Sequence, residues 1–418
     1  MSTVTTQKGW ADKLSDLMEK MAPFFDQPHL ASVRDGLAGL LPLLMVGAFS
    51  LLIVQFPSQS WLDYLSNNKA LSDKLWVPFN MTYGLMSVFA VLNIAYHLAR
   101  RKGLDPLWPA ALSLLAFLVI ASPLLGSGAP ATYLDNRGLF TAIIVGLVTV
   151  EIFNFFVKRN LVFQMPAGVP PSITAAFVAL TPTFVVFVLA WFVRVLLGID
   201  FANGVVQVIS KIIPVASSYV AVAIAETMHA FLWTLGIHGD LTIGIVWQPI
   251  WTSNVAANAA ARASGQAIPW IYTSIFRSYV VPGGSGATLP LAIYMLRSKS
   301  ARLRRVGWLG IWPGIFNINE PITFGTPVIF NPVMAIPFIA ITFINATVAY
   351  FANALNLVTK AFIEPPWTLP APILMYLATG YDIRAAILAI ITEFVIPGII
   401  WFPFFKAWER QVLEKEGA

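Results

Sequence analysis

Runs of about 20 apolar residues, separated by short polar segments, are the feature that most restricts the fold of this chain. A helix needs roughly 20 residues to cross the hydrocarbon core of a bilayer. Inside hydrocarbon the backbone must satisfy its own hydrogen bonds, and an α-helix does this within a single segment. The candidate spans lie at about residues 30–56, 76–98, 105–125, 138–157, 172–198, 215–235, 333–355 and 384–404. The sequence therefore predicts an all-α polytopic membrane protein.

Composition supports this class and excludes several others. Hydrophobic residues make up 57% of the 418 residues and charged residues only 11%, whereas a soluble domain has about 25% charged residues. The net charge of +6 comes from basic residues in short loops between apolar runs. This distribution indicates the excess of basic residues in the cytoplasmic loops of a membrane protein, and not nucleic-acid binding. The chain has no cysteine, which excludes disulfides, thiolate metal sites and a covalent cysteine intermediate within it. We expect neither a metal site nor a cofactor.

The distribution of basic residues predicts how the chain is oriented in the membrane. Basic clusters lie at Arg100–Lys102, at Lys158–Arg159 and, most densely, at Arg297–Arg305. Because such residues concentrate on the cytoplasmic side, we expect both termini in the cytoplasm. Residues 1–28 are polar and lack the apolar core of a signal peptide. Within them, residues 10–25 predict an amphipathic helix, either at the membrane surface or in the cytosol.

The apolar pattern changes near residue 198, which predicts two domains. Residues 199–213 are amphipathic and are predicted to form an interfacial linker between residues 1–198 and 214–418. Downstream of this linker, proline, glycine and polar residues repeatedly break the apolar runs. Interrupted membrane segments of this kind are typical of the binding half of a transporter. We therefore expect residues 214–418 to carry the substrate site.

One broken segment, Pro313–Pro332, combines apolar flanks with the polar residues Asn317, Asn319 and Glu320. Its prolines remove backbone donors and clash with the preceding turn, so a regular helix is not expected. Such backbone is stable at membrane depth only when it is buried in protein or lines a wet cavity. A carboxylate in this setting indicates a functional site. The segment predicts a re-entrant loop with Glu320 at its tip; the alternative is an aqueous loop between two spans.

Other polar residues in apolar surroundings are further candidates. Residues 241–262 carry Gln248 and Asn254, which are too polar for lipid exposure, so a first re-entrant hairpin is predicted there. His238 stands between two glycines at the end of a span, where a ligand role and a packing role are both open. Trp367 is either an interfacial anchor or a surface on which a sugar ring stacks.

Two short patterns indicate metal or phosphate binding only weakly. Glu226 and His229 lie three residues apart on one helical face, but a di-metal site needs this motif from two helices. A structural hydrogen bond is therefore the preferred interpretation. Gly283–Gly286 lacks the Lys-Ser/Thr ending of a nucleotide-binding loop, so its glycines are predicted to let an intramembrane chain bend.

Four stretches together resemble the membrane component, enzyme IIC, of the bacterial sugar phosphotransferase system, in its lactose/cellobiose/diacetylchitobiose family. They are GIHG at 236–239, GGSGATL at 283–289, GIFNINEPITFGTPVIFNPVMAIPF at 314–338, and PPWTLPAPI at 365–373 followed by GYDIRAAIL at 380–388. They occur in this order in that family, and the likeness is strongest in the C-terminal half. The resemblance implies a multi-pass protein of the bacterial cell membrane with the fold of the enzyme IIC glucose superfamily. We expect about ten transmembrane helices and two re-entrant hairpins.

The resemblance also implies where a sugar binds. Carboxylates and amides bind sugar hydroxyls through hydrogen bonds that a charge strengthens. The expected contacts are His238, Asn319, Glu320 and Trp367, with Gln248 and Asn254 as further candidates. If His238 and Glu320 flank the 6-hydroxyl of the sugar, either is a candidate general base for its phosphorylation.

Finally, the resemblance implies a permease that is not catalytic without its partner. The expected substrate is a β-linked disaccharide such as cellobiose, diacetylchitobiose or lactose. A separate enzyme IIB, supplied by enzyme IIA, would phosphorylate it, and the protein would be a homodimer that works by an elevator-like shift. One rival is an ion-coupled secondary sugar transporter, with Glu226, His229, Asp240 and Glu320 as a proton or sodium relay. Another is an intramembrane enzyme that uses Glu320 and His238 as a catalytic pair.

Overall fold

Helices make up all the regular structure of the described chain. The computed structural model describes residues 27–54, 56, 58–121, 133–166, 168–326, 328–329 and 331–416, and these ranges contain no β-strand. The first half contains α2 (Pro28–Ala38), α3 (Leu41–Val54), α4 (Gln59–Asn67), α5 (Lys69–Thr82), α6 (Met86–Arg101), α7 (Leu107–Ala121), α8 (Leu139–Lys158) and α9 (Pro171–Trp191). The second half contains α10 (Phe201–Ala216), α11 (Tyr219–Thr234), α12 (Gly239–Ala263), α13 (Arg277–Val280), α14 (Leu289–Leu296), α15 (Ala301–Ile315), α16 (Glu320–Gly325), α17 (Pro332–Ala354), α18 (Ala371–Ala378), α19 (Ile383–Ile390) and α20 (Ile396–Glu416). The all-α class is confirmed, and the helix predicted at residues 10–25 lies outside the described residues.

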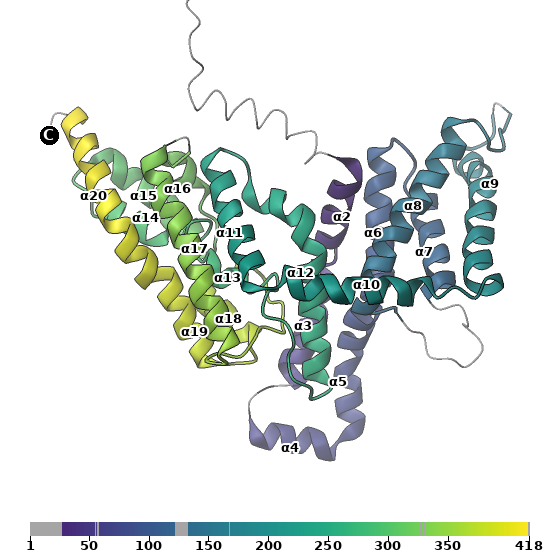
Figure 1. Ribbon diagram of the computed structural model, residues 1–418, viewed down its shortest axis with the longest axis horizontal. Coiled ribbons are helices and arrows are strands. Elements are labelled where there is room, and N and C mark those ends of the chain that lie inside the picture. The colour runs from purple at the N-terminus through teal and green to yellow at the C-terminus, as the bar shows by residue number, and fades with distance from the viewer. Residues whose placement is uncertain are drawn as a thin grey trace, which may run out of the picture.

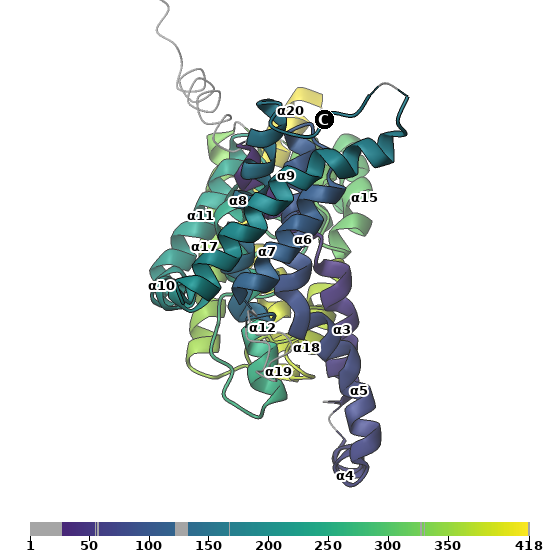
Figure 2. The same ribbon diagram turned by 90° about the vertical axis from the view of Figure 1, so that its right-hand side faces the viewer.

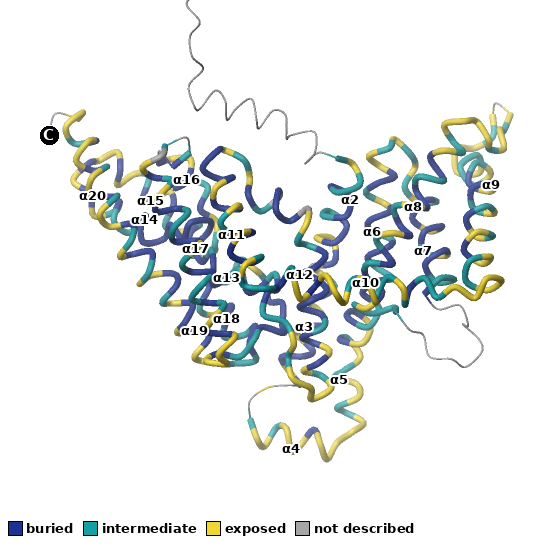
Figure 3. Tube along the Cα trace, in the orientation of Figure 1, coloured by how far each residue is buried: buried dark blue, intermediate teal, exposed yellow. Residues whose placement is uncertain are grey.

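Two groups of helices lie side by side (Figure 1). Helices α6 to α9 form the group on the right of that view, and α11 with α13 to α20 forms the group on the left. The helix α10 runs crosswise along the lower end of the right-hand group, from α9 toward α11, so the segment predicted as an amphipathic linker is helical. Helices α4 and α5 extend away from both groups, as Figures 1 and 2 agree. Exposed residues cover much of α4 (Figure 3).

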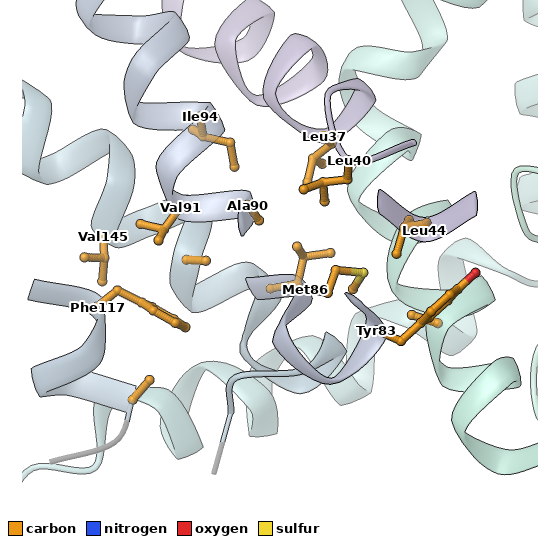
Figure 4. Packing of buried hydrophobic residues seen from close by; sticks show 14 of the residues in the cluster. Leu37, Leu40, Leu44, Tyr83, Met86, Ala90, Val91, Ile94, Phe117 and Val145 are labelled. Atoms are coloured by element: carbon orange, nitrogen blue, oxygen red, sulfur yellow. The ribbon is translucent and has the colours of Figure 1, made fainter. Parts of the chain in front are cut away.

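The N-terminal group packs around α6. Its residues Met86, Ala90, Val91 and Ile94 are fully buried and contact neighbouring helices (Figure 4). Small residues allow this close packing: a Cβ atom at Gly36 of α2 would come within 2.7 Å of the Ile94 Cα. Small residues are the usual means by which helices approach one another in a membrane, where lipid removes most of the hydrophobic driving force.

Six helical segments are long and apolar enough to cross a membrane, or seven if one bent pair counts as a span, within the described residues. They include Asn136–Lys158, Pro171–Leu196 and Val333–Ala354, which match three predicted spans closely. The bent pair is α10 and α11, which meet at 71°. The structure therefore has the several apolar helices of a multi-pass membrane protein, and the total of about ten stays a prediction.

The hairpin predicted at residues 241–262 is wrong. This segment belongs to α12, a continuous helix of 25 residues that contains Pro249. Polar side chains of α12 form hydrogen bonds with other segments of the protein, and no chain reversal is needed. Asn258 donates to the backbone carbonyls of Trp270 and Ala361 and accepts from the Trp270 amide. A continuous helix is stable here because these contacts satisfy its polar face away from lipid.

The proline-broken segment around Glu320 is irregular, as predicted. The helix α15 ends at Ile315, and a loop with Asn317 at a φ of 64° leads to the short helix α16. Pro321 lies in the first turn of α16 and Pro332 begins α17. Prolines are tolerated at these positions because the first turn of a helix does not use those backbone donors.

Candidate functional site

Glu320 is the first residue of α16, and one of its carboxylate oxygens has no partner among the described residues. The residue is half-buried, and Oε2 is buried without a hydrogen bond among the described residues. A buried acceptor without a donor is costly, and ionised oxygens are the most costly of all. The arrangement therefore favours a ligand that supplies a donor, such as a hydroxyl group.

Asn319 connects Glu320 to the glycine loop at residues 283–286. Its Nδ2 donates to the Ser285 carbonyl at 2.6 Å and to Thr288 Oγ1 at 2.7 Å. Gly284 makes this contact possible, because a Cβ atom there would lie 2.3 Å from the Asn319 Cγ and its φ is +95°. The glycine loop thus serves as a support for the Glu320 segment, in agreement with a role in bending the chain.

Asn317 attaches the same segment to the proline-rich stretch that contains Trp367. Its Oδ1 accepts from the Gly283 amide at 2.9 Å, and its Nδ2 donates to the carbonyls of Trp367 and Leu369 at 2.7 Å each. The Trp367 side chain itself is 53% exposed. The hydrogen bond from Asn317 to the Trp367 carbonyl fixes the backbone of Trp367 beside this loop. The exposed indole is therefore available for stacking against a ligand.

His238 lies in the connection between α11 and α12. Its ring centre is 4.5 Å from the Trp233 ring, and 43% of its side chain is exposed. The Trp233 ring in turn contacts Phe324 of α16 at 6.4 Å. The aromatic pair therefore brings the helix that begins at Glu320 close to the loop that carries His238. Gly239 is required here, because a Cβ atom would lie 2.4 Å from the His229 carbonyl.

A largely buried ionic cluster lies next to His238 and consists of Glu226, His229, Asp240, Tyr272 and Arg277, of which Asp240 has a side chain that is 34% exposed. Glu226 Oε1 accepts from the Tyr272 hydroxyl and from Arg277 Nε, each at 2.8 Å. Asp240 Oδ1 accepts from Arg277 Nη1 at 2.7 Å, and Asp240 Oδ2 lies 3.1 Å from His229 Nε2. Two carboxylates therefore surround one guanidinium, and Glu226 and His229 take part in hydrogen bonds, the preferred interpretation of their spacing.

Asp240 joins this buried ionic cluster to the candidate site. Its Oδ2 accepts from Trp233 Nε1 at 3.3 Å and lies 4.0 Å from His238 Nδ1. A second connection runs through Ser285, whose Oγ is 3.3 Å from His229 Nε2. His238 and Asn319, which come from two separate segments, are thereby connected through one contact network, and Glu320 directly follows Asn319.

Gln248 and Asn254 make their contacts elsewhere along α12. Gln248 is half-buried and donates to Thr252 Oγ1 at 3.2 Å. Asn254 is fully buried, and its Nδ2 donates to Ser217 Oγ at 3.0 Å and to the Tyr272 carbonyl at 2.8 Å. The donors of Asn254 are thus used inside the protein.

Arg277 is the residue of this region that sequence reasoning missed. It lies in the apolar run at residues 268–296, where a basic residue is unusual. An intramembrane charge of this kind indicates a paired or functional group. That rule identifies the residue, but its partners at Glu226 and Asp240 depend on the tertiary structure.

Comparisons of sequence and of structure with known proteins give the same family. The model of the family described as "Phosphotransferase system, EIIC" matches residues 34–342. The lichenan permease IIC component of Bacillus subtilis is 35% identical and aligns over 96% of this chain and 94% of its own. The cellobiose-specific EIIC component of Geobacillus stearothermophilus is also 35% identical, over 97% and 95%. The crystal structure of the transporter ChbC, the IIC component from the N,N'-diacetylchitobiose-specific phosphotransferase system, superposes with a TM-score of 0.88 at 33% identity, covering 96% of this chain and 98% of that one.

Proposed function

Since this chain belongs to the EIIC family of the phosphotransferase system, we propose that it is a sugar permease for a β-linked disaccharide. The names of the similar proteins support this substrate class, because lichenan, cellobiose and diacetylchitobiose systems all recur among them. Family membership favours the permease over an ion-coupled transporter or a stand-alone intramembrane enzyme. Cellobiose and diacetylchitobiose are the first substrates to test, followed by lactose.

In this proposal the sugar binds between Glu320, His238 and Trp367. The observation that carries it is the buried Oε2 of Glu320 without a protein donor. A sugar hydroxyl is a donor of the right kind, and a hydrogen bond to a carboxylate is stronger than one between neutral groups. The half-exposed rings of His238 and Trp367 supply a further polar contact and a stacking face. Asn319 contributes through the orientation of Glu320, and the half-buried Gln248 is a further proposed contact, whereas the donors of Asn254 are used inside the protein.

The permease would present the 6-hydroxyl of the bound sugar to a phosphorylated enzyme IIB. Either Glu320 or His238 would accept the hydroxyl proton as the oxygen attacks phosphorus, while the bond from phosphorus to the cysteine sulfur of enzyme IIB breaks and the thiolate leaves. We propose that the phosphate comes from another protein, since this sequence has no cysteine to carry it as enzyme IIB does. Enzyme IIA would resupply that partner.

The transport step is proposed to be an elevator-like movement of residues 214–418 against residues 1–198. The crosswise helix α10 suits a connection between two such bodies (Figure 1). We further propose that the protein forms a homodimer through its N-terminal domain. Both termini of the chain are proposed to lie in the cytoplasm. About ten transmembrane helices are expected, with a re-entrant loop at the broken segment around Glu320.

Binding measurements over a small sugar panel test the proposal. Wild-type protein, His238→Ala and Glu320→Ala are compared by isothermal titration with cellobiose, diacetylchitobiose, lactose and maltose. We expect one β-linked sugar to bind and each substitution to weaken it at least about tenfold, the loss of one charged hydrogen bond. Glu414→Ala, which removes an exposed carboxylate of α20, serves as the control. Unchanged affinity in both site variants would contradict the placement of the site.

A further inference from the structure

A pocket on the surface of α15 has no role in the proposed permease site. It has a volume of about 660 Å³ and is lined by Ala301, Arg304, Arg305, Trp308 and Leu309. The helix α15 lies at the edge of the molecule (Figure 2). We propose that this pocket binds the headgroup of an anionic phospholipid, with Trp308 and Leu309 against its acyl chains.

The charge of the pocket suits a phosphodiester. Five basic residues and no acidic one occur between residues 297 and 305. Arg304 uses its Nη1 to donate to the carbonyls of Ser298 and Lys299, at 2.7 and 2.9 Å, which holds the guanidinium in place. Neither Arg304 nor Arg305 forms an ion pair with a carboxylate within the described chain. Their charges are therefore uncompensated within the part of the chain that the structure describes, and guanidinium groups match phosphate oxygens in geometry.

The apolar part of the pocket excludes a purely aqueous ligand. Trp308 is 61% exposed and Leu309 is 68% exposed, and Trp312 continues the same face at 59%. The Trp308 and Trp312 rings are 6.5 Å apart, so they form one stripe. Exposed side chains of this size are placed more favourably in lipid than in water.

The spacing along α15 matches the depth profile of a bilayer leaflet. At about 1.5 Å per residue, Trp308 lies about 4.5 Å from Arg305 along the helix axis, and Trp312 about 10 Å. The polar zone on each side of the hydrocarbon core is roughly 5–7 Å thick. With α15 along the bilayer normal, Arg305 at the level of the phosphates would put Trp308 at the boundary and Trp312 among the acyl chains. A folded protein partner would not need this graded order, which is why we favour a lipid.

The test uses delipidated full-length protein in a neutral detergent. Phosphatidylglycerol, phosphatidylcholine and inorganic phosphate are each titrated while unfolding is followed by tryptophan fluorescence, and bound lipid is counted by native mass spectrometry. We expect phosphatidylglycerol to raise the melting temperature and the other two to have little effect. Arg305→Gln should weaken phosphatidylglycerol binding about fivefold, the effect of one cation near an anionic surface.

Arg302→Gln provides the matched control, because Arg302 lies in the same turn, carries the same charge and does not line the pocket. Equal loss in both variants would mean that only the net charge matters, and the proposal fails. A response to inorganic phosphate that equals the response to phosphatidylglycerol also overturns the proposal. So does a loss of enzyme IIB binding in Arg305→Gln while its phosphatidylglycerol binding stays intact. Sugar affinity should be unchanged in Arg305→Gln, so this test is separate from that of the permease site.

Discussion

The side-chain amide of Asn319 donates to the backbone carbonyl of Ser285 at 2.6 Å, which fastens the residue before Glu320 to the glycine loop. Two segments that are 34 residues apart in sequence thereby form one unit. The bond is fully buried, so water does not compete for it. The position of the Glu320 carboxylate therefore depends on backbone geometry at Gly284 as well as on its own helix.

Gly284→Ala should displace Asn319 and abolish sugar binding. The added Cβ atom would lie 2.3 Å from the Asn319 Cγ, and a φ of +95° disfavours any side chain. Gly265→Ala is the matched control, because Gly265 has a φ of +70° and no atom within 4 Å of the new Cβ. The control should lose about 1–2 kcal/mol of stability and keep its sugar affinity. Sugar titration and thermal unfolding distinguish the two; full affinity in Gly284→Ala would contradict the proposed support.

Glu226→Gln should destabilise the protein by about 3–5 kcal/mol, since it removes one partner of a buried ion pair. The Glu226 side chain is fully buried and lies 2.8 Å from Arg277 Nε, and the change leaves that guanidinium with Asp240 alone. Glu151→Gln is the comparison, because Glu151 pairs with Lys102 at 2.7 Å but is 38% exposed. Surface pairs contribute less than about 1 kcal/mol. Denaturation in detergent measures both, and equal losses would show that the cluster is unimportant for folding.

Glu320→Gln should separate binding from phosphorylation. The amide keeps the shape of the side chain and retains one acceptor oxygen, so binding should fall less than about tenfold. It cannot take up a proton at neutral pH, so phosphate transfer from enzyme IIB should fall by at least about a hundredfold, the usual effect of a general base. The measurements are sugar titration and transfer of labelled phosphate in the presence of enzyme IIB. A parallel loss of both would refute the base role of Glu320 and leave His238 as the candidate.

Asp382 should make stability depend on pH in acid. Partial burial alone would raise the pKa of Asp382, but hydrogen bonds from Arg384 and Thr359 outweigh it and hold the pKa at about 2. The folded pKa is below the ordinary value of 3.8, so the stabilisation is complete above that pH and is lost as pH falls toward about 2.

Comparison of melting temperatures at pH 6 and pH 2.5 tests this expectation. Asp382→Asn should be less stable than wild type at pH 6, and the difference should shrink at pH 2.5. Asp73→Asn, which changes an exposed carboxylate of α5, should show no such dependence. A constant difference for Asp382→Asn across this range would exclude a role for its ionisation.

The sequence predicted the long helices well and the polar C-terminal half only in part. The spans at α8, α9 and α17 follow from unbroken apolar runs, because a backbone in hydrocarbon has to pair within its own segment. The same rule applied to residues 241–262 gave a hairpin where the protein has the continuous helix α12. The polar residues in that run indicated that it contacts protein and not lipid. The local sequence does not determine whether that contact comes from a chain reversal or from other segments.

For the candidate site, the sequence by itself determined which residues are exceptional: Glu320 among prolines, His238 between glycines, and glycines at 283–286 in an apolar run. Each is unusual for its surroundings, and that is visible without coordinates. The tertiary structure alone decided that Asn319 meets Ser285 and that Asp240 and Glu226 share Arg277. These pairings join segments that are 34 to 51 residues apart, so they depend on how whole helices pack and not on any local pattern.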